Sequence, residues 1–258
     1  MAKKWAKFPH ADKAYVYDGA ALKKHWDRLH RGDCEPFPKD QGALDAWRLY
    51  HAGEFQNAVE AGTSAGGGGI TAAIKAQVIY ANYCEKQEKA KLALFEEAAE
   101  WASSRRSAAP KDANAHYLYA YALGRYSQGI SVAKALAQGF GGKIKDALTT
   151  AIKLAPSHAD AHTAYGAYQA EVINKVGGLV AGMTYGARKD SALEHYQKAV
   201  KLNPDSAIAR IEYANGLILL FAKERLDEAT RLYEQAAKCK PADAMERLDV
   251  ELAKSELE

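Results

Sequence analysis

A motif that recurs three times constrains this chain more than any other feature of its sequence. In KIKDALTTAIKLAP, RKDSALEHYQKAVKLNP and ERLDEATRLYEQAAKCKP, three apolar or aromatic residues and the final proline are separated by 4, 3 and 5 residues. Residues 4 and 3 positions apart lie on one face of an α-helix, and proline cannot continue a helix. Each motif therefore predicts an amphipathic helix that ends near its proline. Ser and Asp after each proline are typical helix N-caps, so a second helix is expected to follow.

These helix pairs resemble the tetratricopeptide repeat (TPR), a unit of about 34 residues with small residues where its two helices touch. Small residues stand at the matching positions Ala120, Gly166 and Ala214. The resemblance covers residues 40–258 and is most specific after residue 110. It implies an all-α fold, an α-solenoid of TPR-like antiparallel helix pairs wound as a right-handed superhelix, with about five pairs in this chain.

Spacing between the prolines divides the chain further. Successive prolines at 110, 156, 204 and 241 are 46, 48 and 37 residues apart, and the excess in the first two units lies in inserts at 129–142 and 174–187. In the last helix, Met245, Leu248 and Leu252 alternate with Glu246 and Asp249, so we expect one face to seal the stack and the other to face water. The predicted parts are an N-terminal arm with a single helix (1–39), divergent helical repeats (40–110), TPR-like repeats with both inserts (111–241) and a C-terminal capping helix (242–258).

Composition excludes several classes of protein. The 35 Lys and Arg residues against 32 Asp and Glu leave a net charge of +3, too small to indicate a nucleic-acid-binding protein. No apolar run approaches the roughly 20 residues of a membrane span, and the first residues lack the apolar segment of a secretory signal. Three widely spaced cysteines indicate reduced thiols rather than disulfides. We expect a cytoplasmic protein of bacterial type.

Candidate catalytic and metal sites are weak. The glycine run 66–69 lacks the preceding strand and the Lys-Ser/Thr pair of a phosphate-binding loop. His158 and His162 have a spacing that can bring two imidazoles to one metal, but no third ligand is evident, which favours a packing role. The cysteines have no recognisable base partner. We therefore expect no enzymatic activity, no metal and no cofactor.

A partner-binding groove is the leading functional hypothesis. In TPR proteins the first helix of each pair lines the concave surface, and tyrosines suit binding because they offer a large area with few rotatable bonds. The resemblance implies a non-enzymatic protein–protein interaction module, an adaptor or scaffold that binds a peptide or a domain. An alternative is that the tyrosines pack between helices or against the N-terminal arm. The groove residues carried over by alignment are Tyr80, Tyr83, Tyr117, Tyr121, Arg125, Thr163 and Asn215.

Two other functions stay open. Residues 1–33 hold eight Lys and Arg against four acids, and residues 224–258 hold ten acids against six Lys and Arg. These opposite charges suggest a homo-oligomer or a filament assembled head to tail. The third hypothesis is a solenoid that binds a small apolar ligand in a pocket roofed by the two inserts. For the inserts themselves, packing within the chain is favoured over contact with a membrane surface.

Overall fold

Regular structure is entirely helical in the part of the chain that the computed structural model describes, residues 4–258, and no strand occurs there. The all-α class predicted from the sequence is confirmed. Residues 1–3 of the predicted N-terminal arm lie outside this part. Within it, no helix combines the length and hydropathy needed to cross a bilayer. The helices are α1 (Gly19–Leu29), α2 (Gln41–His51), α3 (Phe55–Ala65), α4 (Gly69–Tyr83), α5 (Glu88–Ala108), α6 (Ala113–Gln128), α7 (Val132–Ala137), α8 (Phe140–Leu154), α9 (Ala159–Val176), α10 (Gly178–Val180), α11 (Lys189–Leu202), α12 (Ala207–Phe221), α13 (Leu226–Ala237) and α14 (Ala244–Ser255), with short turns of 3₁₀ or π type at Lys13–Tyr15, Ala181–Tyr185 and Ala222–Arg225.

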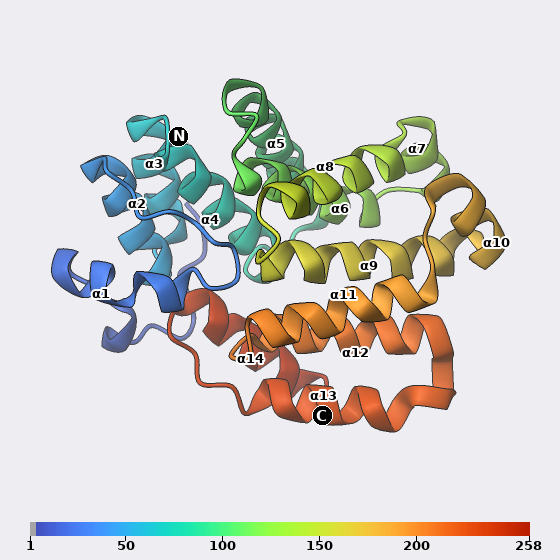
Figure 1. Ribbon diagram of the computed structural model, residues 1–258. Helices are drawn as coiled ribbons and strands as arrows, with labels where there is room; N and C mark the ends of the chain where they lie inside the picture. Colours follow the sequence, from blue (N-terminus) through green and yellow to red (C-terminus); the bar gives the residue numbers. More distant parts are fainter. Residues whose placement is uncertain (1–3) are drawn as a thin grey trace.

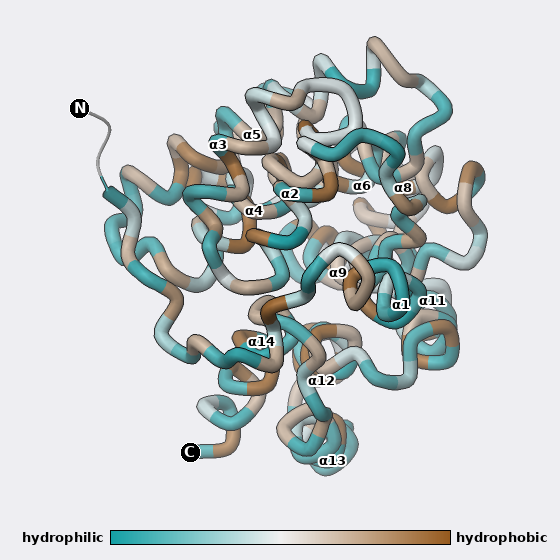
Figure 2. The backbone as a smooth tube through the Cα atoms, turned by 90° about the vertical axis from the view of Figure 1, so that its left-hand side faces the viewer, coloured by the Kyte–Doolittle hydropathy of each residue, from teal (hydrophilic) through white to brown (hydrophobic). Residues whose placement is uncertain are grey.

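Consecutive helices pack as pairs, and the pairs stack in chain order (Figure 1). The pairs are α2 with α3, α4 with α5, α6 with α8, α9 with α11, and α12 with α13. The first insert contains α7, and the second contains α10 and the π turn. Hydrophilic residues predominate on the outer surfaces of α1 and α13 (Figure 2).

The same local signal starts the first helix of four successive units. In each unit the residue two positions after the proline is the N-cap, and its side chain accepts a hydrogen bond from a backbone amide of the first turn. Three of these caps are Asp or Ser, as expected, and the fourth is His158, whose Nδ1 accepts from the amide of Ala161 at 3.1 Å. The four N-caps are Asp112, His158, Ser206 and Asp243.

Close helix contacts depend on small residues around Tyr196, the aromatic residue of the second repeated motif. A Cβ at Gly166 would lie 2.9 Å from the ring of Tyr196, and a Cβ at Gly216 would lie 2.6 Å from its hydroxyl oxygen. Tyr196 is buried and stacks on Tyr213 with the ring centroids 5.3 Å apart. The ring is therefore clamped between α9 and α12, and it leaves no space for a side chain at either glycine.

The two ends of the solenoid meet. Helix α14 contacts α2, and α1 lies beside the last helices (Figure 1). The Arg28 guanidinium donates to both carboxylate oxygens of Glu246 at 2.6 and 2.9 Å. His51 Nδ1 lies 2.7 Å from a carboxylate oxygen of Asp243. These contacts join residues almost 200 or more positions apart and close the array into a ring of helices.

This closure corrects the expectation for the last helix. Glu246 and Asp249 of α14 are buried rather than facing water, because this acidic face packs against Arg28 and Tyr83 of the N-terminal half. One cation of the basic end, Arg28, thus pairs with Glu246 of the acidic end, while Arg31 donates at 2.7 Å to Asp205, which lies outside that acidic segment.

The glycine clamp on Tyr196 generates a stability prediction. We expect Gly216→Ala to lower the free energy of unfolding by about 1–3 kcal/mol, because the new methyl group overpacks a buried ring. Gly124 in α6 has open space around its Cβ position. We expect the matched control Gly124→Ala to raise the free energy of unfolding by up to about 1 kcal/mol through helix propensity. Urea denaturation followed by circular dichroism measures the free energy of unfolding of both variants. A change in the same direction for the two variants would contradict the close packing of Tyr196 on Gly216.

Candidate functional site: a cavity on the concave face

A cavity of about 200 Å³ lies on the concave face, partly open to solvent. Its wall comes from α4, α6, α9, α12 and α14, the helices that the stacking turns inward, and from the first insert. Most of the wall is apolar, and charged side chains occur along its whole length, including Asp160 near the start of α9 and the ion pair of Glu171 with Lys175 near its end. The end of the cavity near the N-termini of α6 and α9 is here called the inner end, and the end near the inserts the outer end.

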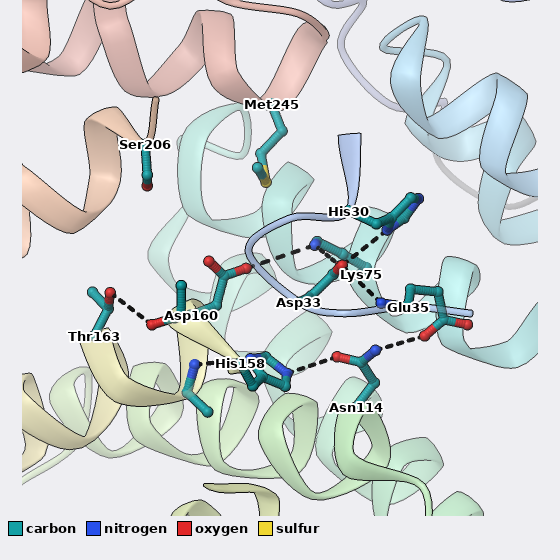
Figure 3. Close-up of polar contacts among 12 residues, drawn as sticks. His30, Asp33, Glu35, Lys75, Asn114, His158, Asp160, Thr163, Ser206 and Met245 are labelled. Carbon is teal, nitrogen blue, oxygen red and sulfur yellow. Dashed lines mark hydrogen bonds and ion pairs between the residues drawn. The ribbon is translucent and has the colours of Figure 1, made fainter. Parts of the chain in front are cut away.

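A segment of the chain itself packs beside the inner end, where its residues Gly32 and Asp33 line a small chamber that adjoins the cavity. Residues 30–35, here called the inner loop, contact Lys75 in the middle of α4 and the N-terminal ends of α6 and α9 (Figure 3). The carbonyl oxygen of Gly32 accepts from the backbone amide of Asp160 at 3.0 Å. Glu35 accepts from the side-chain amide of Asn114 at 2.6 Å, and Asp33 forms a buried ion pair with Lys75. The inner loop is thus fixed to three helices beside the inner end of the cavity.

Burial and neighbouring charges shift the pKa values of the inner loop in opposite directions. Burial opposes ionisation of Asp33, but the Lys75 ammonium and His30 outweigh it and hold the pKa of Asp33 well below its usual range. For Glu35, burial and the charges of Asp33 and Asp112 raise the pKa to about 8. The loop therefore carries one ionised and one protonated carboxyl group at neutral pH.

Polar side chains cross the middle of the cavity. The Tyr83 hydroxyl on α4 donates to the carboxylate of Asp249 on α14. The Arg125 guanidinium on α6 donates to Glu212 on α12 at 2.9 Å, and it lies 5.4 Å from the ring centroid of Tyr121. Both contacts span the concave face between helices that are not sequence neighbours, so they fix the width of the cavity.

The two inserts cover the outer end, where many of the wall residues are apolar. Here the wall is formed by Val132 and Leu136 of α7, together with Phe140, Tyr168, Val172, Val176 and Tyr185. The inserts pack closely on each other, since a Cβ at Gly141 would lie 2.7 Å from the Tyr185 ring. Leu179 and Met183 at the tip of the second insert nevertheless stay 78% and 81% exposed.

Five of the seven predicted groove residues line this cavity: Tyr83, Tyr117, Tyr121, Arg125 and Thr163. The structure places the other two elsewhere. Tyr80 stacks on Trp5 of the N-terminal arm with centroids 4.0 Å apart, and its hydroxyl accepts from the amide of Ala6. Asn215 accepts a hydrogen bond from the Tyr233 hydroxyl, in the packing between α12 and α13.

Both differences have a local reason. Tyr80 precedes Tyr83 by three residues, so the helix turns its side chain about 60° away from that of Tyr83 and toward the arm. On α12, Ile208 and Glu212 face the cavity instead of Asn215. The arm packing that the sequence left open as an alternative therefore applies to Tyr80, which we withdraw with Asn215 from the proposed site.

Four charged residues that the repeat pattern does not mark also line the cavity: Lys75, Asp160, Glu212 and Asp249. Lys75 carried a detectable signal, because it is the single charged residue of α4. A lone cation in an otherwise uncharged helix indicates either a surface position or a buried ion pair. Asp249 carried no such signal, since its position on an amphipathic helix is typical of a solvated residue.

The histidines and cysteines have structural surroundings. His158 caps α9, and its Nε2 lies 2.9 Å from the amide oxygen of Asn114. Burial raises the pKa of the Cys34, Cys84 and Cys239 thiols, that of Cys84 to about 11. Across residues 4–258, no group of three or more His, Cys, Asp and Glu side chains is arranged to hold a metal ion.

The raised pKa of Glu35 predicts a pH-dependent contribution to stability. The pKa rises from 4.5 to about 8 on folding, so the contribution is fully present below pH 4.5 and is lost as the pH rises through about 8. We expect Glu35→Gln, which keeps an oxygen for Asn114, to raise the melting temperature more at pH 9 than at pH 5. Thermal unfolding at the two pH values, with the exposed Glu60→Gln as control, measures the difference. An equal change in the melting temperature of Glu35→Gln at pH 5 and pH 9 would contradict the raised pKa of Glu35.

Comparisons with known proteins place this fold. No curated protein matches the chain significantly. Among solved structures, a thermophilic TPR protein of Thermus thermophilus has a TM-score of 0.57 and 18% sequence identity, covering 83% of this chain and 97% of that one. This likeness confirms the TPR-like α-solenoid. The family profile of regulator of microtubule dynamics protein 1-3 matches residues 71–257. Because this match spans well over half of the chain, the protein belongs to the regulator of microtubule dynamics protein 1-3 family.

Proposed function

We propose that this protein is a non-enzymatic binding module that holds a small apolar molecule in the cavity of its concave face. A TPR-like fold suggests an interaction module in general terms. The observation that carries the finer proposal is the narrowing of the groove, with the inner loop beside one end, the contact of Tyr83 with Asp249 across it and the inserts at the other end. A mostly apolar cavity that is only partly open to solvent suits a small ligand better than an extended peptide.

The size of the cavity supports this choice. An apolar cavity of roughly 150 Å³ in another protein takes up a ring the size of benzene, and the cavity here is about 200 Å³. Small residues of α9, Ala164 and Ala167, line its middle and leave the space free. At the outer end, the buried Tyr168 hydroxyl has no hydrogen-bond partner in the protein, so it is available to a ligand that extends that far.

Two features favour binding over catalysis. The thiols have raised pKa values, so they are poor nucleophiles at neutral pH. The charged groups on the cavity wall are engaged in ion pairs or hydrogen bonds that fix the helices, rather than in a nucleophile–base arrangement.

A second candidate is the binding of a partner protein at the mouth of the cavity, in keeping with an adaptor role. It is favoured by the exposed apolar residues Leu136, Leu179 and Met183 on the two inserts. Exposed apolar side chains that gather at one place mark interaction surfaces in soluble proteins.

Filling the cavity tests the leading proposal. We expect wild-type protein to bind the neutral fluorophore N-phenyl-1-naphthylamine with enhanced emission. Ala167→Phe should weaken its affinity by at least about tenfold, or 1.4 kcal/mol, because the ring occupies the ligand's space. Ala93→Phe on the exposed side of α5 is the matched control. Titration followed by fluorescence measures the affinities, and unchanged binding by Ala167→Phe would refute the cavity as the site.

The second candidate has its own test. We expect a partner protein captured from lysate by the wild type to be lost from Leu179→Ser/Met183→Ser, while Ala167→Phe still captures it. Mass spectrometry of the eluates identifies the partner. Equal capture by the insert variant and the wild type would contradict binding at the mouth.

A further inference from the structure

Charges on the cavity wall do not balance. Among the described residues that line the cavity, three are cationic, and each already has a carboxylate partner. The pairs are Arg125 with Glu212 at 2.9 Å, Lys175 with Glu171 at 3.5 Å, and Lys75 with Asp33. Two carboxyl groups of the wall, those of Asp160 and Asp249, have no cation of their own.

Asp249 is the clearer of the two. It is 2% exposed, and its hydrogen-bond partner is the neutral hydroxyl of Tyr83. Burial raises its pKa well above the ordinary value, and the nearby Glu246 and Asp243 raise it further. A buried carboxylate with no counter-charge is costly, and one that lines a cavity can gain its counter-charge from a ligand.

Asp160 shares its cation. One of its carboxylate oxygens lies 4.0 Å from the Lys75 ammonium, which is paired more closely with Asp33 (Figure 3). Burial, only partly offset by Lys75, raises the pKa of Asp160 to about 6. The inner end of the cavity therefore has two acidic groups with less than one cation available to them.

An independent observation points to a hydrogen-bond donor at the same place. A small chamber of about 20 Å³ adjoins the inner end, and its lining includes Asp160, Asp249 and Asn203. Asn203 is 6% exposed, and its amide oxygen Oδ1 accepts no hydrogen bond within the protein. Buried acceptors are normally hydrogen-bonded, so this amide oxygen favours a hydrogen-bond donor in the chamber. Because the amide is neutral, this preference is separate from the charge imbalance.

We infer that the ligand of this cavity carries a primary ammonium group, held at the inner end by Asp249, Asp160 and the Asn203 amide oxygen, with its apolar chain lying along α9 toward the inserts. A primary ammonium has three N–H donors, one for each of these acceptors. A chamber of about 20 Å³ also has room for one water molecule, which would satisfy Asn203 but would supply no charge. The inference rests on the proposed function and names the chemical class of the ligand.

Three probes of equal chain length and different head groups test the inference. Binding of n-octylamine, n-octanol and octanoate to the full chain at pH 7.5 is measured by isothermal titration calorimetry. We expect octylamine to bind at least tenfold more tightly than octanol, and octanoate to bind most weakly. Asp249→Asn, which keeps an oxygen for Tyr83, should abolish the preference for the amine while octanol binds as before. The exposed Asp190→Asn should keep the preference.

The outcomes separate this inference from the proposed function. Equal binding of amine and alcohol, or tighter binding of octanoate, overturns the ammonium site while the apolar cavity stands. A preference that survives in Asp249→Asn overturns the role of Asp249. If neither the octyl probes nor N-phenyl-1-naphthylamine bind, both proposals fall. The comparison of head groups on the wild type needs no variant, so it holds even if Asp249→Asn fails to fold.

Discussion

The contact of α14 with the N-terminal helices is the interaction on which the rest of this structure depends. Helix stacking alone gives an open array with a solvated concave face. Here the bidentate contact of Arg28 with Glu246 and the hydrogen bond of Tyr83 to Asp249 bring the first and last units together. The same acidic helix face therefore closes the ring and supplies one wall of the cavity, which turns a groove into a pocket.

Closing the ring of helices buries polar and charged side chains, and their pairing with one another lowers the cost of burying them. The Lys75 ammonium is inside the protein and is tolerated because Asp33 of the inner loop neutralises it. Asn114 joins two further groups, as donor to Glu35 and as partner of His158. The inner loop is thus held by side chains of α4 and α6 and by a backbone amide of α9, so the inner end of the cavity depends on the assembled ring.

The fold could be read from the sequence because its signals are local. Apolar periodicity, the repeated proline and the cap two residues later all act within one helix pair. The closure could not be read in this way, since Arg28 and Glu246 are 218 residues apart and each looks like a solvated charge in its own helix. For the candidate site, the register of α6 was enough to place Tyr117, Tyr121 and Arg125 on one helix face, which lines the cavity, whereas the packing of Tyr80 against the N-terminal arm depends on a contact distant in sequence.

Ring closure also changes how this chain should fold. In open repeat arrays, contacts are local, stability is close to a sum over units, and folding can begin at any unit and spread. Contacts between residues more than 200 positions apart raise the contact order and delay part of the stabilisation until the whole array has formed. The terminal units, usually the first to fray, are here tied to each other. A linear array has in this way acquired the cooperativity of a globular domain.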